Sequence, residues 1–343
     1  MEKWYSLSGK NNDVVISGRV RLARNFSNFK FSPKITDEEA NEMVNQVIGQ
    51  FMDSFSEKYR TIRMKDCNDI NKKALKQQRI ISSHLAKSNE GAVLLSPNES
   101  VSVMLNAEDH VRIQVFCNGM NLQSCYNKAN KIDDFLDSKF DYAFDEKYGY
   151  KTTYPTNLGT GMRVDYTLHL PALFASKKLS HIINEVGRFG IRIESVFGDE
   201  GNAYGSFYRI SNQKTLGHSE KEIIKDLDDI TNQIIRQERE QRKYLYEQDK
   251  FQTEDMAYKS YGVLKYARKL SLRDALTLIS ELWLGISLSI IKPDTDKFSI
   301  NRIINEIQPA VIEDAAGSAI TEEDKSVIRA EYLRNNIPEL EVK

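Results

Sequence analysis

Apolar and polar residues alternate in several short runs within the first 210 residues, which is the pattern of half-buried strands. Residues 92–95 and 101–105 are predicted to pair through a turn at 97–99. In the run 111–115 the alternation places Arg112 and Gln114 on the face opposite the apolar residues. Further strands are predicted at residues 166–170, 191–194 and 207–210. These runs together indicate a sheet in the first part of the chain.

Apolar residues at helical spacing predict helices around this sheet and throughout the last quarter of the chain. Capping boxes at Thr36–Glu39 and Ser219–Glu222 mark two helix starts, and the charge-rich stretch 236–250 continues the second helix. Other helices are predicted at 72–87, 121–140, 176–189, 255–267, 271–291, 300–307 and 321–335, with Pro293 and Pro309 as breakers. The prediction is an α+β protein, in which an antiparallel sheet domain flanked by helices (1–250) precedes a small all-helical domain (251–343).

Composition limits the classes of function that the chain can have. Its 343 residues are 40% hydrophobic, which supports a sizeable core, and 48 Lys and Arg residues balance 49 Asp and Glu residues. A formal net charge of -1 indicates neither a nucleic-acid nor a membrane partner, so a polyanion site would have to be local. Three cysteines without paired spacing, no apolar signal at the N-terminus and no membrane-length apolar stretch favour a cytoplasmic protein with free thiols.

Two charged clusters follow predicted strands. Arg19 and Arg21 share one side of an extended segment, where two guanidinium forks could hold a chain of phosphates. Glu108 lies at a strand end close to Arg112, an arrangement that can position charge in a cleft. The alternatives are surface arginines paired with acids and a solvent-facing polar strand face, and the residue pattern alone leaves them open.

Two loops contain several glycines. The stretch Tyr154–Arg163 combines a proline, Asn157, Gly159 and a cation, although such clusters are usually turns. Residues 197–205 contain Asp199 and have the composition of a loop that closes over substrate. No G-x-x-x-x-G-K-[ST] motif occurs, so a phosphate site of the P-loop type is not indicated.

Taken together, the segments 17–25, 106–114, 141–150, 154–163 and 210–217 resemble the ATP:guanidino phosphotransferases (phosphagen kinases). The resemblance extends over nearly the whole chain and is strongest to the bacterial protein-arginine kinases. It implies a phosphagen-kinase-like catalytic domain, with ATP and Mg²⁺ as cofactors. Mg²⁺ would be held by phosphate oxygens and water, without a metal site made by the protein.

The resemblance also implies roles for individual residues. Glu108 would be the catalytic acid, and Asp199 would be a second substrate-binding acid in the closing loop. The substrate loop would contain Tyr154, Asn157 and Gly159. Nucleotide contacts would come from Ser17, Arg19, Arg21, His84, Arg112 and Arg163.

Several positions depart from the family pattern. Tyr154 replaces a reactive cysteine, and a neutral phenol cannot reproduce a thiolate. Glu194 replaces a phosphate-facing arginine, which should weaken phosphate binding if the position still faces the phosphates. Val164-Asp165 replaces a small Ala-Ser pair. In the C-terminal domain only Arg329-Ala330 remains of an Arg-Asp-x-x-Arg-Ala motif linked to phosphoarginine recognition, so phosphoarginine binding there is not expected.

The function that the resemblance implies is transfer of the ATP γ-phosphoryl group to arginine guanidinium groups of proteins, in bacterial stress response and protein quality control. Its partners would be proteins with exposed arginines, a zinc-binding activator protein, a heat-shock repressor and an unfoldase-protease, and the chain could act as a homodimer. The alternative is a catalytically weakened pseudokinase that keeps nucleotide or client binding and acts as a regulator.

Overall fold

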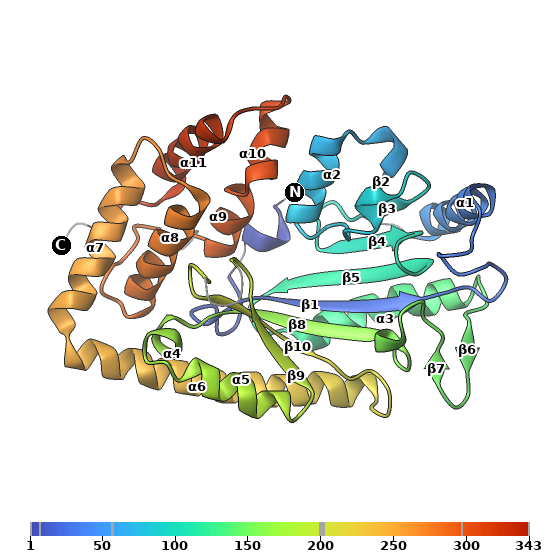
Figure 1. Ribbon diagram of the computed structural model, residues 1–343, viewed down its shortest axis with the longest axis horizontal. Coiled ribbons are helices and arrows are strands. Elements are labelled where there is room, and N and C mark those ends of the chain that lie inside the picture. Colours follow the sequence, from blue (N-terminus) through green and yellow to red (C-terminus); the bar gives the residue numbers. More distant parts are fainter. Residues whose placement is uncertain (1, 7, 56–57, 199–202, 296–297, 342–343) are drawn as a thin grey trace.

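The computed structural model describes residues 2–6, 8–55, 58–198, 203–295 and 298–341. Eight antiparallel strands form one sheet in the order β2-β3-β4-β5-β1-β8-β10-β9 (Figure 1). The strands are β1 Val15–Arg24, β2 Arg60–Arg63, β3 Ala92–Leu95, β4 Val101–Leu105, β5 Val111–Asn118, β8 Met162–His169, β9 Ile191–Ser195 and β10 Phe207–Asn212. A separate hairpin joins β6 Phe144–Asp145 to β7 Gly149–Tyr150.

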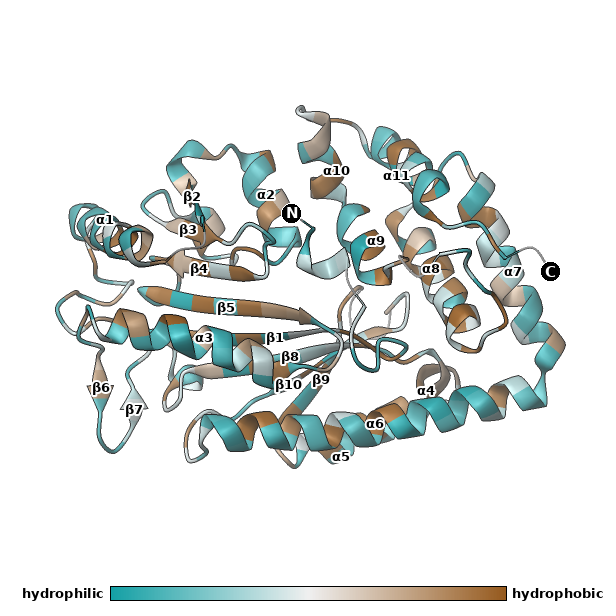
Figure 2. Cartoon of the chain, turned by 180° about the vertical axis from the view of Figure 1, so that it is seen from behind, coloured by the Kyte–Doolittle hydropathy of each residue, from teal (hydrophilic) through white to brown (hydrophobic). Residues whose placement is uncertain are grey.

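The helices of the first part of the chain cover the sheet unequally, with most of them on one face. Their bounds are α1 Asp37–Ser54, α2 Asp69–Gln77, α3 Leu122–Asp137, α4 Pro171–Ala175, α5 Leu179–Gly187 and α6 Glu220–Gln248. Helices α3, α5 and α6 contact the central and outer strands, and their apolar residues form the main core with Val20, Leu22 and Ile113 of the strands. Figure 2 shows apolar and polar patches alternating along α6, as its partly buried position requires. Helix α2 lies on the opposite face, where its Leu75 packs against an apolar cluster that contains Val93, Leu95 and Met104.

The last part of the chain is helical, as predicted. Helix α6 ends at Gln248, and Asp249 caps the next helix by accepting a hydrogen bond from the backbone N–H of Gln252. The division at residue 250 stays a prediction, because Ile16 and Phe207 join the apolar cluster of these helices. The helices are α7 Lys250–Tyr266, α8 Leu272–Ser287, α9 Ile300–Glu306, α10 Pro309–Ala316 and α11 Glu322–Asn336.

The fold class is confirmed, but two helix predictions were wrong. The helix predicted at 72–87 ends at Gln77, because Arg79 adopts a positive φ of 63° and Ile80 and Ile81 turn into a small apolar cluster. Pro309, predicted to be a breaker, instead occupies the first turn of α10. A proline is tolerated there because its missing N–H would have had no partner inside the helix. Within the described residues, no helix is both long enough and apolar enough to cross a bilayer.

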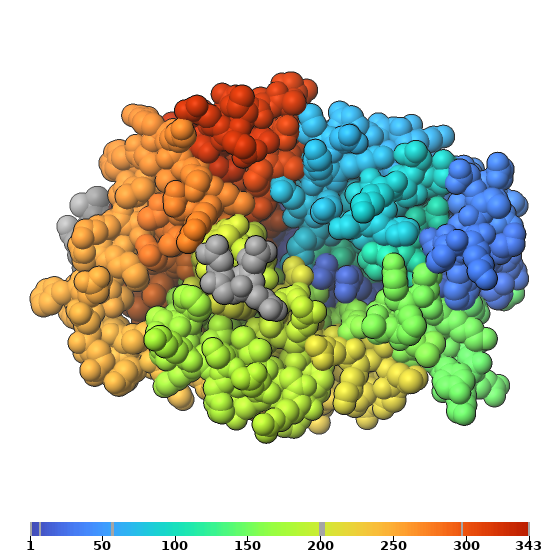
Figure 3. Space-filling view, viewed as in Figure 1, coloured from blue at the N-terminus to red at the C-terminus, as the bar shows by residue number. Residues whose placement is uncertain are grey.

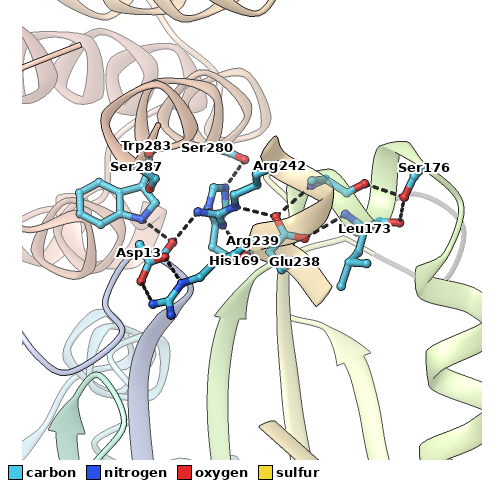
Figure 4. A network of polar contacts seen from close by, with 11 residues as sticks. Asp13, His169, Leu173, Ser176, Glu238, Arg239, Arg242, Ser280, Trp283 and Ser287 are labelled. Carbon is cyan, nitrogen blue, oxygen red and sulfur yellow. Dashed lines mark hydrogen bonds and ion pairs between the residues drawn. The ribbon is translucent and has the colours of Figure 1, made fainter. Parts of the chain in front are cut away.

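A buried polar network connects the sheet, α6 and the C-terminal helices (Figure 4). Glu238 and Arg242 of α6 form an ion pair of 2.7 Å, with side chains 0% and 3% exposed. Glu238 also accepts hydrogen bonds from the first N–H groups of α4, and Arg242 donates to the backbone oxygens of Asp13 and His169. The His169 imidazole is 2.7 Å from the Ser280 hydroxyl of α8. Burial, reinforced by Arg242, lowers the pKa of His169 well below its usual range, so its ring is neutral.

This network predicts a large difference between two neighbouring substitutions on α6. Glu238→Gln should lower the free energy of unfolding by about 3 kcal/mol or more, because it leaves the Arg242 charge buried without a counter-ion. Arg239→Gln removes a half-exposed ion pair with Asp13 and should cost less than about 1 kcal/mol. Urea unfolding followed by circular dichroism measures both values. Equal losses would contradict the assigned role of the buried pair.

Candidate active site

The sheet face opposite α3, α5 and α6 is lined by arginines from four strands. In the strand register, Arg21 lies opposite Gln114 of β5 and Arg163 of β8, and Arg19 lies opposite Asp165. Because side chains alternate along a strand, the apolar neighbours of these residues point into the core and the polar side chains point to the opposite face of the sheet. We call this surface the arginine face and define it by Arg19, Arg21, Arg112, Arg163 and Arg209, with Arg79 from the segment after α2. Figure 3 shows that the molecule is hollowed at its centre, where dark-blue atoms from the beginning of the chain are visible.

A buried carboxylate occupies the centre of the arginine face. Asp165 Oδ2 lies 2.8 Å from Arg19 Nε and 2.7 Å from Arg19 Nη2, and Oδ1 lies 2.8 Å from Arg79 Nη2. Arg209 Nε is 3.8 Å from Oδ1. Burial raises the pKa of Asp165, but Arg19, Arg79 and Arg209 together outweigh it and hold the pKa below its usual range. Asp165 is therefore ionised and neutralises part of the charge on this face.

Arg21 is the arginine of this face that is most available to an added anion. Its Nε is buried and has no hydrogen-bond partner among the described residues, and the Nε atoms of Arg79 and Arg209 are in the same condition. Burial lowers the pKa of Arg21, and the neighbouring Arg19 and Arg112 lower it further. Buried donors without a partner are costly, so this part of the face suits a ligand with several acceptor oxygens.

The acid expected to be catalytic lies at one end of the arginine face. Glu108, in the turn between β4 and β5, forms an ion pair with Arg112 Nη1 and accepts a hydrogen bond from the Ser82 hydroxyl, both at 2.9 Å. Its side chain is 16% exposed, so the carboxylate is held in place but can still be reached. The adjacent Asp109 is fully buried and accepts a 2.7 Å hydrogen bond from the backbone N–H of Thr153. This contact fixes the acid turn to the start of the loop that contains Tyr154.

Arg163 anchors that loop instead of projecting freely. Its guanidinium donates to the backbone oxygens of Thr156 (2.6 Å) and Asn212 (2.7 Å) and to the side chain of Asn157 (3.2 Å). The resemblance implied a phosphate contact for Arg163, and such a contact would have to share these donors. Tyr154 is 48% exposed, and no side-chain hydrogen bond is recorded for it in the described part of the chain.

A second arginine, Arg24, also contacts the loop that contains Tyr154. Arg24 is 1% exposed, forms a 2.6 Å ion pair with Asp133 of α3 and donates to the backbone oxygen of Thr160. Its guanidinium carbon lies 3.5 Å from the ring centroid of Tyr150 in the β6–β7 hairpin. The loop is thus fixed by buried charge at both of its ends.

The remaining predicted residues lie in different places. Ser17 is buried and lines a cavity of about 160 Å³ that also borders Arg79, Thr167 and Arg209. His84 is exposed and lines a separate depression beside Lys87 and Asn106, so the structure does not bring it together with the arginines. Asp199 lies outside the described residues.

Glu194 is on the side of the arginine face but is already paired. It lies opposite Arg209 in the β9–β10 register and is 3.4 Å from Arg209 Nη1 and 3.0 Å from Arg192 Nη2. Sequence reasoning did not identify Arg209 and Arg79 as members of the site. The alternation of β10 contained a signal for Arg209, whereas nothing in the sequence pattern indicated that Arg79 would fold onto the sheet.

The C-terminal remnant of the family motif has a structural role. Arg329 is 2% exposed and donates to the backbone oxygens of Ile307 and Leu270. Lys325 is paired with Glu313 at 2.9 Å and with Glu322 at 3.0 Å. The charged groups of Arg329 and Lys325 are therefore engaged in contacts among the C-terminal helices and the segments that connect them.

Comparison with known proteins identifies the family to which this chain belongs. The family model "ATP:guanido phosphotransferase, C-terminal catalytic domain" matches residues 39–241, and "Protein-arginine kinase McsB C-terminal domain" matches residues 250–343. The chain therefore belongs to the ATP:guanido phosphotransferase family. It is 38% identical to the protein-arginine kinases of Bacillus subtilis (98% of this chain, 93% of the relative) and of Clostridium kluyveri (98% and 99%).

Solved structures share the fold at low sequence identity. A lombricine kinase matches with a TM-score of 0.59 and 18% identity over 68% of both chains. The duplicated taurocyamine kinase from Schistosoma mansoni with bound transition state analog components matches with a TM-score of 0.61 and 19% identity, over 93% of this chain and 49% of that one. The predicted family resemblance and fold class are confirmed.

The loop geometry predicts that Gly159 cannot be replaced. Its φ is +106°, and an added Cβ would lie 2.3 Å from the backbone oxygen of Thr215. Gly159→Ala should therefore lower the free energy of unfolding by at least about 1–3 kcal/mol from backbone strain alone. Gly187→Ala, at a helical position where a Cβ meets no atom within 4 Å, should be neutral or slightly stabilising. Thermal unfolding of the two variants tests this, and a neutral Gly159→Ala would show that the loop backbone differs.

Proposed function

We propose that this chain is an ATP-dependent protein-arginine kinase. The proposal rests on the arginine face, where the buried Nε of Arg21 has no hydrogen-bond partner among the described residues, and on Glu108 in the adjoining β4–β5 turn. A face of this charge suits the phosphates of a nucleotide, and the fixed carboxylate suits a cationic acceptor. Membership of the ATP:guanido phosphotransferase family supports both assignments.

The chemistry follows from charge and position. A guanidinium stays protonated at neutral pH, since its pKa lies above about 12, and it must lose a proton to become a nucleophile. In the proposed reaction the nitrogen attacks the γ-phosphorus, the bond from that phosphorus to the bridging oxygen breaks, and ADP leaves. Glu108 orients the guanidinium and takes the proton. Arg21 and Arg112 would stabilise the charge on the transferring group and on ADP.

The structure offers room for the rest of the nucleotide beside the arginine face. The cavity of about 160 Å³ has apolar walls, including Val196, Phe197 and Ile304, and side-chain amides such as Asn305. Such a lining fits a flat base that also forms hydrogen bonds. Mg²⁺ would be bound by the phosphate oxygens and water.

The proposed function includes a class of substrate and a set of partner proteins. Protein substrates with exposed arginines are favoured because the relatives are named protein-arginine kinases and the McsB C-terminal domain model covers the last helices. We further propose that the chain acts in the cytoplasm, as a homodimer, with a zinc-binding activator, a heat-shock repressor and an unfoldase-protease as partners. The family resemblance alone supports these partners.

A second candidate function has specific observations in its favour. Tyr154, Glu194 and Asp165 each replace a family residue, and Asp165 places a carboxylate among the phosphate-binding arginines. A protein that binds nucleotide but transfers phosphate slowly or not at all would act as a regulator.

The first experiment distinguishes these two functions. Incubation with Mg·ATP and unfolded casein, followed by mass spectrometry, should detect phosphoarginine. Glu108→Gln should reduce its formation by at least about 100-fold, because the proton acceptor is lost. Glu185→Gln, which removes the same charge at an exposed position of α5, serves as the matched control and should be unaffected. Absence of phosphoarginine together with intact nucleotide binding would reject the kinase and favour the regulator.

Tyr154 allows a gain-of-function test. Tyr154→Cys should raise the rate of phosphoarginine formation by about 10-fold, equivalent to about 1.4 kcal/mol of transition-state stabilisation. The reason is that a thiolate beside a guanidinium adds a negative charge that a neutral phenol lacks. Tyr154→Phe should match the unmodified protein. A decrease in Tyr154→Cys would show that the phenol itself contributes to the reaction.

A further inference from the structure

Asp165 uses hydrogen-bond donors that a phosphate would need. All three guanidinium nitrogens of Arg19 have internal partners, since Nε and Nη2 contact Asp165 and Nη1 donates to Gln114 at 3.1 Å. Arg79 donates from Nη2 to Asp165 and from Nη1 to the Thr167 hydroxyl at 3.3 Å. Both carboxylate oxygens are therefore engaged by cations, as the oxygens of a bound phosphate would be.

The same carboxylate fixes the backbone after α2. Arg79 has a positive φ of 63°, which is an unfavourable conformation for a residue with a side chain. Its backbone oxygen accepts a 2.7 Å hydrogen bond from Gln114 Nε2, and its side chain reaches Asp165. The ion pair with Asp165 thus holds the Arg79 guanidinium, which comes from outside the strands, on the arginine face. The same ion pair uses a hydrogen-bond donor of Arg79.

The charges around Asp165 favour exchange with an anionic ligand. Arg209 is 3.8 Å from Asp165, and its Nε, like those of Arg21 and Arg79, is buried without a hydrogen-bond partner. A phosphate at this place would offer oxygens to these unsatisfied donors but would also be repelled by the Asp165 carboxylate. The two anions therefore compete for the same group of guanidiniums.

We propose that Asp165 is an internal competitor of the nucleotide phosphates, which sets the nucleotide affinity of this chain by occupying Arg19 and Arg79. The inference rests on the proposed function, because it assumes that the arginine face is the nucleotide site. Binding of ATP or ADP requires these arginines to exchange part of their contact with Asp165 for contact with phosphate. Asp165 is thus a residue that determines affinity, and it has no part in proton transfer.

Isothermal titration calorimetry with Mg·ATP and Mg·ADP tests the proposal. Asp165→Asn, which keeps the shape, and Asp165→Ser, which restores the small family residue, should each lower the Kd for both nucleotides by at least about 10-fold. The salt dependence of binding should also become steeper, because the face has gained one net positive charge. The matched control is Glu194→Gln, a partly exposed carboxylate at the edge of the same face, which should change the Kd by less than the Asp165 variants do.

The outcomes separate the inference from the function on which it rests. An unchanged or higher Kd in folded Asp165→Ser and Asp165→Asn overturns the inference, even if the unmodified protein forms phosphoarginine. Tighter binding in these variants supports it, even if no phosphoarginine is formed and the kinase proposal fails. Loss of the circular dichroism signal of the folded state in both variants also overturns it, because Asp165 would then be a structural counter-ion.

Discussion

Mutual repulsion among guanidinium groups on one sheet face is the constraint on which the site depends. Six arginines converge there, and burial weakens the solvent screening that would separate their charges in water. The carboxylates of Asp165 at the centre, Glu108 at one end and Glu194 beside Arg209 offset this repulsion. The positive charge of the arginine face is therefore partly neutralised within the protein. Arg21 remains available to bind an added anion.

The fold supplies the rigidity that such a charge arrangement requires. Apolar residues on the opposite side of β1, β5 and β8 lock the register that places Arg19 beside Asp165. Buried ion pairs hold the periphery, with Arg24 and Asp133 below the substrate loop, and Glu238 and Arg242 where the sheet meets the C-terminal helices. Desolvation offsets much of the attraction within each pair, but loss of one partner would leave the other charge buried without a counter-ion.

Sequence reasoning predicted the fold class, most strands and the common side of Arg19 and Arg21, because these follow from local periodicity and capping. It did not predict the fold of the segment after α2, where burial of Ile80 and Ile81 overrides helical propensity. The site was predicted only in part, because the partner of each arginine depends on contacts between distant segments. From the sequence, Asp165 was only a substitution beside a loop. The phosphate contact of Arg163 stays a prediction, and the structure adds that its guanidinium also donates to backbone oxygens.

A crystal structure with Mg·ADP, nitrate and an arginine-containing peptide would show whether the arginine face holds the nucleotide, since nitrate takes the place of the transferring phosphoryl group. We expect diphosphate oxygens within hydrogen-bond distance of Arg21, with nitrate between Arg112 and a peptide guanidinium held by Glu108. Diphosphate bound away from the arginine face, for example in the depression beside His84 and Lys87, would contradict it.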